Sequence, residues 1–84
     1  MAKVTIYSKD WCPFCKRAKQ LLASKGTRFK NIDIEAKPEL RAEMVSLSGR
    51  QTVPQIFINN RHIGGCDDLF ALESQGELEP LLNS

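Results

Sequence analysis

The sequence predicts an α/β fold, a four-stranded mixed sheet flanked by helices, with the elements in the order β-α-β-α-β-β-α. Two observations carry this prediction. A strand, a helix and a second strand follow one another within about 30 residues near the amino end, and such a βαβ unit has parallel strands with a right-handed crossover. Further along, Asn59-Asn60 separates two apolar runs. Asparagine tolerates the left-handed turn of a two-residue hairpin, which joins antiparallel strands.

The predicted elements follow from the hydrophobic pattern and from its interruptions by glycine and proline. Strands are expected at residues 4–7, 28–34, 53–58 and 61–63, and helices at 13–25, 38–49, 66–76 and 78–82. Pro13 and Pro38 suit the first position of a helix, where the missing N–H would have had no intrahelical partner. In the second helix, Leu40, Met44 and Leu47 recur at helical spacing and are expected to face the core.

The length of 84 residues is enough for one domain, residues 1–84, with a single core. The composition, 42% hydrophobic and 26% charged, is typical of a globular protein and includes no apolar run long enough to span a membrane. The net charge of +2 argues against a nucleic-acid partner. The first strand pattern begins at Val4, which leaves no room for a signal peptide, and three cysteines are too few for a disulfide scaffold. We therefore expect a cytoplasmic monomer.

Cys12 and Cys15 are separated by two residues at the start of the first predicted helix. Residues three positions apart on a helix share a face, so the two sulfurs can close a small disulfide or bind one metal ion. An isolated C-x-x-C pattern occurs both in redox proteins and in zinc sites. The pair therefore indicates either a redox-active disulfide or a metal site, and other motifs in the chain must distinguish the two.

Cys12 is expected at the mouth of this helix, where unpaired backbone N–H groups and the positive end of the helix dipole favour an anion. The cations Lys9, Lys16 and Arg17 lie close to it in the sequence. A thiol in such a place is expected to have a depressed pKa and to act as the nucleophile. Cys15 lies one turn further into the helix, where it is more protected, and it fits the role of the resolving thiol.

Two further motifs accompany the cysteine pair. Thr52-Val53-Pro54 precedes the third predicted strand, and Gly64-Gly65-Cys66-Asp67 follows the fourth. Together with C-x-x-C after the first strand, these motifs resemble the glutaredoxins, which have the thioredoxin fold. The short chain is most similar to bacterial dithiol glutaredoxins of the glutaredoxin 3 type, over nearly its whole length. The resemblance implies a glutathione-disulfide oxidoreductase of electron transport and cell redox homeostasis, with glutathione as co-substrate and no tightly bound cofactor.

The resemblance also implies roles for individual residues. Cys12 and Cys15 are the expected catalytic pair, and a cis peptide bond is expected before Pro54. The positions that contact glutathione in the family correspond here to Lys9, Phe14, Arg41, Thr52, Val53, Pro54, Gly65, Cys66 and Asp67. Asp67 is expected to take the ligand's ammonium at the mouth of the third helix, whose N–H groups suit the adjacent carboxylate. The implied partners are glutathionylated or disulfide-bonded proteins, with ribonucleotide reductase as the family's example.

Two residues depart from the family pattern. Phe14 stands where tyrosine is usual, so the ring is kept while a hydroxyl hydrogen bond worth about 1 kcal/mol is lost. Trp11 stands where a small polar residue is commoner and where thioredoxins have tryptophan. It is interpreted either as a contact for partner proteins or as a partly buried spacer.

Three alternatives remain open from the sequence. A thioredoxin-like reductase would take its electrons from a flavoprotein instead of glutathione. A glutaredoxin dimer would share an iron–sulfur cluster through Cys12 and two glutathiones, although Pro13 favours catalysis. A zinc site would use Cys12, Cys15, His62 and Cys66, but the second pair lacks the usual ligand spacing. Outside the catalytic step, Cys66 is expected to be a packing residue more than a third redox thiol, and His62 a surface residue.

Overall fold

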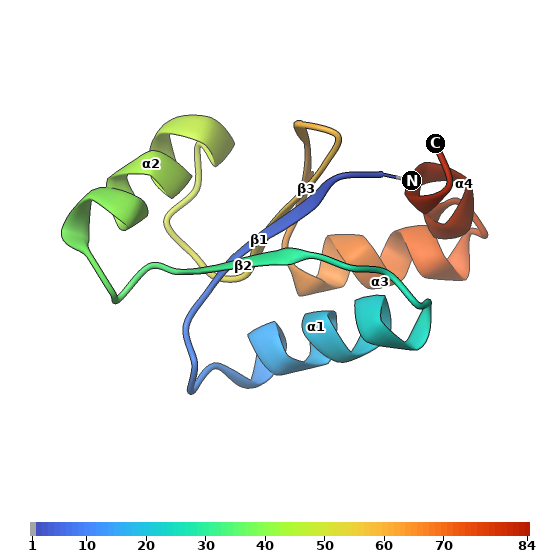
Figure 1. Cartoon of the computed structure of the whole chain (residues 1–84), viewed down its shortest axis with the longest axis horizontal. Helices are drawn as coiled ribbons and strands as arrows, with labels where there is room; N and C mark the ends of the chain where they lie inside the picture. The colour runs from blue at the N-terminus through green and yellow to red at the C-terminus, as the bar shows by residue number, and fades with distance from the viewer. Residues whose placement is uncertain (1) are drawn as a thin grey trace.

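The computed structural model describes residues 2–84, and Met1 lies outside the described residues. The strands are β1 (Val4–Ser8), β2 (Lys30–Asp33), β3 (Gln55–Ile58) and β4 (Arg61–Gly64), and the helices are α1 (Pro13–Ser24), α2 (Pro38–Ser48), α3 (Cys66–Ser74) and α4 (Leu78–Leu82). The element order is the predicted one, and the final short helix closes the chain beside its amino end (Figure 1). Over residues 2–84, none of the helices is long and apolar enough to cross a membrane.

The strands form one mixed sheet in the order β2-β1-β3-β4. β2 runs parallel to β1, whereas β3 is antiparallel to both β1 and β4. The parallel pair confirms the predicted βαβ unit. The predicted hairpin is confirmed as well, because Asn59 and Asn60 have φ angles of 52° and 66°, which are those of a left-handed turn. The fold is therefore the predicted thioredoxin-type α/β arrangement.

Two cores lie on opposite faces of the sheet, because alternate residues of a strand point to opposite sides. α1 and α3 run side by side under one face, and α2 lies across the other (Figure 1). The larger core, between the sheet and α1, α3 and α4, buries Val4, Ile6, Ala18, Leu22, Ile56, Ile58, Cys66, Leu69, Leu78 and Leu82. The smaller core, under α2, buries Tyr7, Ile34, Met44 and Phe57.

The predicted inner stripe of α2 is partly wrong. Met44 is fully buried, but Leu47 is 58% exposed and lines a shallow hollow next to His62. The helix packs through Met44 and its neighbour Val45, so its contact side is rotated away from Leu47. Hydrophobic spacing identified the helix correctly, but a short stripe could not fix which edge of it meets the sheet.

The starts of two strands differ from the prediction by two residues each, and three strand ends differ by one residue. β2 begins at Lys30 instead of residue 28, because its pairing with β1 starts only at the Thr5–Lys30 register. β3 begins at Gln55, since the Val53–Pro54 peptide bond is cis and these two residues belong to the loop before the strand. This loop lies beside the start of α1, where Cys12 Sγ is 4.0 Å from the Val53 carbonyl oxygen.

Candidate active site

The topology brings three loops to one edge of the sheet. The loop after β1 leads into Cys12, and the loop before β3 contains Pro54. The turn after β4 contains Gly65. Because β3 is antiparallel to β1 and to β4, the start of β3 lies beside the end of β1 and the end of β4. The three motifs that are far apart in the sequence therefore meet, at the carboxyl end of the central strand β1, where α/β sheets usually hold their sites.

Cys12 is the N-cap residue of α1. Its backbone is extended, with φ −77° and ψ 119°, and Pro13 occupies the first helical position, as predicted. The N–H of Cys15 donates to Cys12 Sγ at 3.4 Å, and the N–H of Lys16 donates to the Cys12 carbonyl at 3.1 Å. The Cys12 sulfur thus occupies the place that a side-chain oxygen takes in an ordinary N-cap, and the free N–H groups of the helix face it.

The two cysteines differ in their access to solvent. Both are free thiols, but Cys15 is completely buried, whereas Cys12 is 5% exposed and lies 4.0 Å from the Val53 carbonyl. Burial, together with the hydrogen bond to Cys12, raises the pKa of Cys15 to about 12. Cys15 is therefore a neutral thiol near pH 7 that solvent does not reach, and its backbone N–H contacts Cys12 Sγ.

A cleft of about 330 Å³ opens next to Cys12. Cys12 and Cys15 are not part of its described lining, but Cys12 Sγ lies 4.0 Å from the carbonyl oxygen of Val53, which is. Its walls are Phe14, Arg50, Thr52, Val53, Pro54, Gly65, Cys66, Asp67 and Asp68. The set includes every residue that the sequence predicted for glutathione contact except Lys9 and Arg41. The cis peptide bond predicted before Pro54 is confirmed.

Lys9 and Arg41 lie outside the described lining of this cleft. The Lys9 carbonyl accepts from the N–H of Cys12 at 3.2 Å, but its ammonium nitrogen lies 5.2 Å from the centroid of the Trp11 ring. Arg41 is exposed on α2. The sequence placed both residues by their position relative to the motifs, and their contact with a ligand stays a prediction.

Two residues of the cleft were missed from the sequence. Asp68, in the first turn of α3, accepts from the N–H of Gly65 at 2.9 Å and from Arg50 Nη1 at 3.1 Å. The Gly65 hydrogen bond and then the guanidinium of Arg50 lower the pKa of Asp68. An acidic residue three positions after an N-cap is a recognisable signal for the first contact. The Arg50 pair is half-exposed and adds less than about 1 kcal/mol.

Gly64 is required by its backbone conformation and by close approach at this turn. Gly64 has φ +125°, and a Cβ there would lie 2.2 Å from Asp68 Oδ2, so neither the backbone nor the space admits a side chain. A Cβ on Gly65 would lie 3.4 Å from the Pro54 carbonyl oxygen. Gly65 therefore lies close to the cis-proline loop and leaves room for no more than an ordinary van der Waals contact there.

His62 is not the free surface residue that the sequence predicted. Its ring is half-buried, lies 5.1 Å from the Phe57 ring, and has Nε2 2.7 Å from Gln55 Oε1. Burial lowers the pKa of His62, and the charge of Arg50 lowers it further. Within residues 2–84, no group of three or more His, Cys, Asp or Glu side chains gathers where it could hold a metal ion. His62 therefore does not join the cysteines in a zinc site.

Trp11 is 63% exposed, so the interpretation as a partly buried spacer is wrong. Its indole N–H donates to Glu35 Oε1 at 3.0 Å, and the Lys9 ammonium lies over its ring. Phe14, which lines the cleft, is 54% exposed. Two aromatic rings are therefore presented to solvent around Cys12, and one of them is held in place by two polar contacts.

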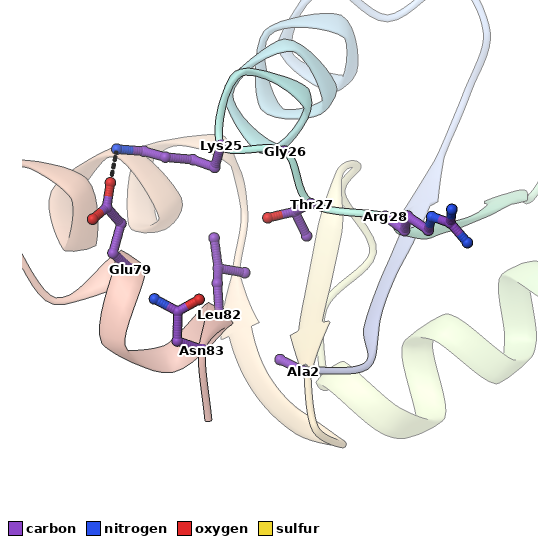
Figure 2. A pocket seen from close by; sticks show the side chains of 8 residues that line it. All are labelled: Ala2, Lys25, Gly26, Thr27, Arg28, Glu79, Leu82 and Asn83. Carbon is purple, nitrogen blue, oxygen red and sulfur yellow. Dashed lines mark hydrogen bonds and ion pairs between the residues drawn. The ribbon is translucent and has the colours of Figure 1, made fainter.

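A second hollow, of about 300 Å³, lies at the other end of α1 (Figure 2). Its lining includes Lys25, whose ammonium nitrogen lies 2.6 Å from Glu73 Oε2 and 3.0 Å from Glu79 Oε1. These hydrogen bonds, first that to Glu73, raise the pKa of Lys25. The hollow lies at the far end of α1 from Cys12 and its lysine is already paired with two carboxylates, so we interpret it as a junction between α1 and the two carboxyl-terminal helices.

Comparison with known proteins gives a consistent result. Residues 4–63 match the family model described as Glutaredoxin. The chain is 57% identical over 82 residues to Glutaredoxin 3 of Escherichia coli (strain K12), covering 98% of this chain and 99% of that protein. It is 55% identical over 84 residues to Glutaredoxin of Pseudomonas aeruginosa, covering 100% of both.

Solved structures agree in fold. The crystal structure of a buckwheat glutaredoxin–glutathione complex superposes with a TM-score of 0.91 at 32% identity, over 98% of this chain and 77% of that one. The solution structure of glutaredoxin from Brucella melitensis superposes with a TM-score of 0.86 at 60% identity, over 98% of this chain and 89% of that one.

Proposed function

Because the chain belongs to the glutaredoxin family of thiol-disulfide oxidoreductases, we propose that it reduces glutathione mixed disulfides and protein disulfides at the expense of glutathione, through Cys12 as nucleophile and Cys15 as resolving thiol. The observation that carries the proposal is the cleft beside Cys12. It joins the cis-proline loop, the α3 N-terminus and the Phe14 ring within one ligand-sized space.

For a glutathione mixed disulfide only Cys12 is needed. Its thiolate attacks the glutathione sulfur, the bond between that sulfur and the substrate sulfur breaks, and the substrate leaves as a thiolate that takes up a proton. Cys12 then carries glutathione through a disulfide. A second glutathione thiolate attacks the sulfur of the bound glutathione, which releases oxidised glutathione and restores the Cys12 thiolate. The Cys15 N–H, 3.4 Å from Cys12 Sγ, supports the negative charge at the start and the end of the cycle.

For a protein disulfide both cysteines are used. Cys12 attacks one substrate sulfur and expels the other as a thiolate, which takes up a proton. Cys15 then loses its proton and attacks Cys12 Sγ, so that the substrate leaves fully reduced and Cys12 and Cys15 form a disulfide. Two glutathiones reduce this disulfide and leave as oxidised glutathione. The burial of Cys15 keeps it inert until Cys12 presents a disulfide sulfur beside it.

Glutathione is proposed to lie along the walls of the cleft. The first turn of α3 offers backbone N–H groups to the γ-glutamyl carboxylate near Gly65 and Cys66, and the exposed Asp67 offers its carboxylate to the ammonium group. The backbone of Val53 is available for strand-like hydrogen bonds with the peptide. Phe14 supplies an apolar ring but no hydroxyl, so this contact is one of packing alone.

Trp11 is proposed to contact the polypeptide of protein substrates. Its side chain is exposed next to Cys12 but does not line the cleft in which glutathione is placed. We therefore place it against the polypeptide that carries the substrate sulfur of the mixed disulfide. Trp11→Ala is expected to raise KM for a glutathionylated protein by roughly tenfold, since a buried tryptophan contact is worth more than about 1 kcal/mol. KM for a mixed disulfide of glutathione and free cysteine is expected to stay within about twofold.

Leu47→Ala is the matched control, because Leu47 is also an exposed large hydrophobic residue but lies outside the cleft. Steady-state kinetics of the three proteins on the two substrates measure the effect. An equal change of KM for both substrates in Trp11→Ala, or none for the protein, would refute the contact.

The electron source tests the proposed function as a whole. With NADPH, glutathione and glutathione reductase, the wild-type protein is expected to reduce the mixed disulfide of glutathione and cysteine at a rate proportional to its concentration. With NADPH and thioredoxin reductase, it is expected to be nearly inactive. The reverse outcome would assign a thioredoxin-like reductase. If the protein purified without oxygen is a dimer that absorbs visible light, a shared iron–sulfur cluster is favoured. A colourless, active monomer supports the proposal.

A further inference from the structure

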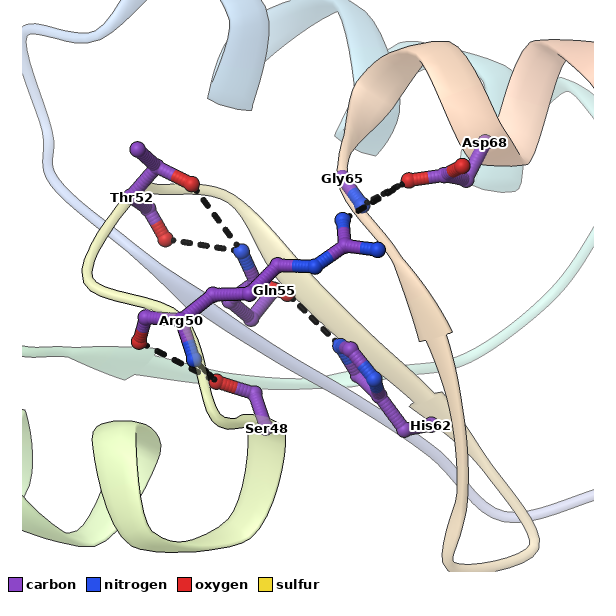
Figure 3. A network of polar contacts seen from close by, with 7 residues as sticks. All are labelled: Ser48, Arg50, Thr52, Gln55, His62, Gly65 and Asp68. Atoms are coloured by element: carbon purple, nitrogen blue, oxygen red, sulfur yellow. Dashed lines mark hydrogen bonds and ion pairs between the residues drawn. The ribbon is translucent and has the colours of Figure 1, made fainter.

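Gln55, the first residue of β3, is a buried polar side chain that the proposed mechanism leaves unused. It is fully buried, and its carboxamide bridges two segments (Figure 3). On one side, Nε2 donates to the Thr52 carbonyl at 3.0 Å and to Thr52 Oγ1 at 3.2 Å. On the other side, Oε1 lies 2.7 Å from His62 Nε2. All the polar groups of this side chain are thus directed to two residues.

The direction of these hydrogen bonds follows from the chemistry of their partners. A carbonyl oxygen only accepts, so the amide nitrogen of Gln55 must face Thr52. Its oxygen then faces His62, and Nε2 of that ring must carry the proton and donate. The imidazole is thereby fixed as the Nε2–H tautomer, and its ring packs against Phe57 at an interplanar angle of 40°.

The donor and acceptor roles in these hydrogen bonds also determine whether the Thr52 hydroxyl can donate to a ligand in the cleft. Its hydroxyl oxygen accepts one proton of the Gln55 amide, so the hydroxyl's own proton remains available to a second partner. Thr52 lines the cleft and is exposed, so this partner is an acceptor in the cleft or water. A Thr52 hydroxyl used as a donor suits an anionic oxygen of the ligand.

We propose that Gln55 is a positioning residue that holds Thr52 as a hydrogen-bond donor toward a carboxylate of glutathione, and that His62 holds Gln55 in the required orientation. The inference rests on the proposed glutathione-dependent function. Neither residue touches the reacting sulfurs. Their effect is expected in the binding of glutathione, because they fix the loop that forms one wall of the cleft.

The test uses Gln55→Met, which keeps an unbranched side chain of similar length and removes every polar atom of the bridge. We expect KM for glutathione to rise about fivefold to tenfold with kcat within about twofold, because one oriented hydrogen bond to a charged group is lost. Gln51→Met is the matched control, since Gln51 is exposed and lies in the same loop. It should leave both constants within about twofold of wild type.

His62 provides the second arm. His62→Gln retains an amide N–H that can donate to Gln55 and should keep KM near the wild-type value, whereas His62→Leu should raise it in the same direction as Gln55→Met. Nitrogen-15 NMR of the wild-type imidazole is expected to show the Nε2–H tautomer at neutral pH. This readout needs no variant and stands even where a substitution prevents folding.

The outcomes separate this inference from the function on which it rests. A wild-type protein that does not use glutathione would overturn the proposed function itself. If the wild type uses glutathione, an Nδ1–H tautomer would overturn the positioning role. A Gln55→Met variant equal to Gln51→Met would do the same, and so would a loss of kcat at constant KM.

Discussion

Cys12→Ser is expected to lose both activities, the reduction of glutathione mixed disulfides and that of protein disulfides. Each route begins with attack by the Cys12 sulfur, and a serine hydroxyl is a far weaker nucleophile toward sulfur at neutral pH. The rate should fall by more than about 10³-fold on either substrate, which corresponds to about 4 kcal/mol of transition-state stabilisation. Glutathione-coupled rates on both substrates measure this loss.

Two further measurements show whether the loss is chemical. Serine is a good N-cap, so the thermal unfolding of Cys12→Ser should stay close to that of the wild type. After incubation with oxidised glutathione, mass spectrometry should detect a glutathione adduct on a Cys15→Ser protein but none on Cys12→Ser. A folded Cys12→Ser protein that still turns over either substrate would show that another thiol is the nucleophile.

Cys15→Ser is expected to separate the two activities. The reduction of a glutathione mixed disulfide needs no second cysteine and should remain within severalfold of the wild-type rate. The reduction of a protein disulfide should fall by about 10²-fold or more, because the mixed disulfide between Cys12 and the substrate then waits for an external thiol. That trapped complex should be visible on a non-reducing gel. Equal losses on both substrates would contradict the division of roles between the cysteines.

The buried state of Cys15 adds a pH dependence to this comparison. The attacking species is the thiolate, and burial is the largest cause of the pKa of about 12. Below that pKa the thiolate fraction rises about tenfold per pH unit. In the wild type, protein-disulfide turnover limited by the resolving step should therefore increase from pH 7 to pH 9. In Cys15→Ser an external glutathione thiolate resolves the mixed disulfide instead, so the residual turnover should level off above about pH 8.5, the ordinary pKa of a free thiol, whereas the wild-type turnover should continue to rise.

Local sequence signals predicted the part of the site that depends on local structure. The placement of Cys12 at a helix N-cap follows from Pro13 and from the strand before it, and both features lie within a few residues. The hairpin turn followed in the same way from Asn59-Asn60. The cis bond before Pro54 and the lining of the cleft came from the family resemblance, because the meeting of the three motifs depends on the order of the strands.

The misses concern contacts between segments that are distant in the sequence. Arg50 and Asp68 are 18 positions apart, and nothing near either residue indicates the other. His62 was expected at the surface because strand alternation points it away from the larger core, but the second face of this sheet is covered in part, by α2 and by the Gln55 side chain. Trp11 donates to Glu35, which lies 24 positions away in the loop after β2, and nothing near Trp11 indicates this contact.

The small core under α2 has a consequence for the cooperativity of the molecule. Met44 is the one buried residue of that helix, whereas α1 and α3 rest on the larger core. Segments with few buried contacts open locally at a lower free energy than global unfolding requires. The amide hydrogens of α2 are therefore expected to exchange through local opening, before those of α1 and α3, which hydrogen–deuterium exchange would measure. Val53 packs on this same small core, whereas Cys66 is buried in the larger one, so the cleft has walls in two units that we expect to differ in local stability.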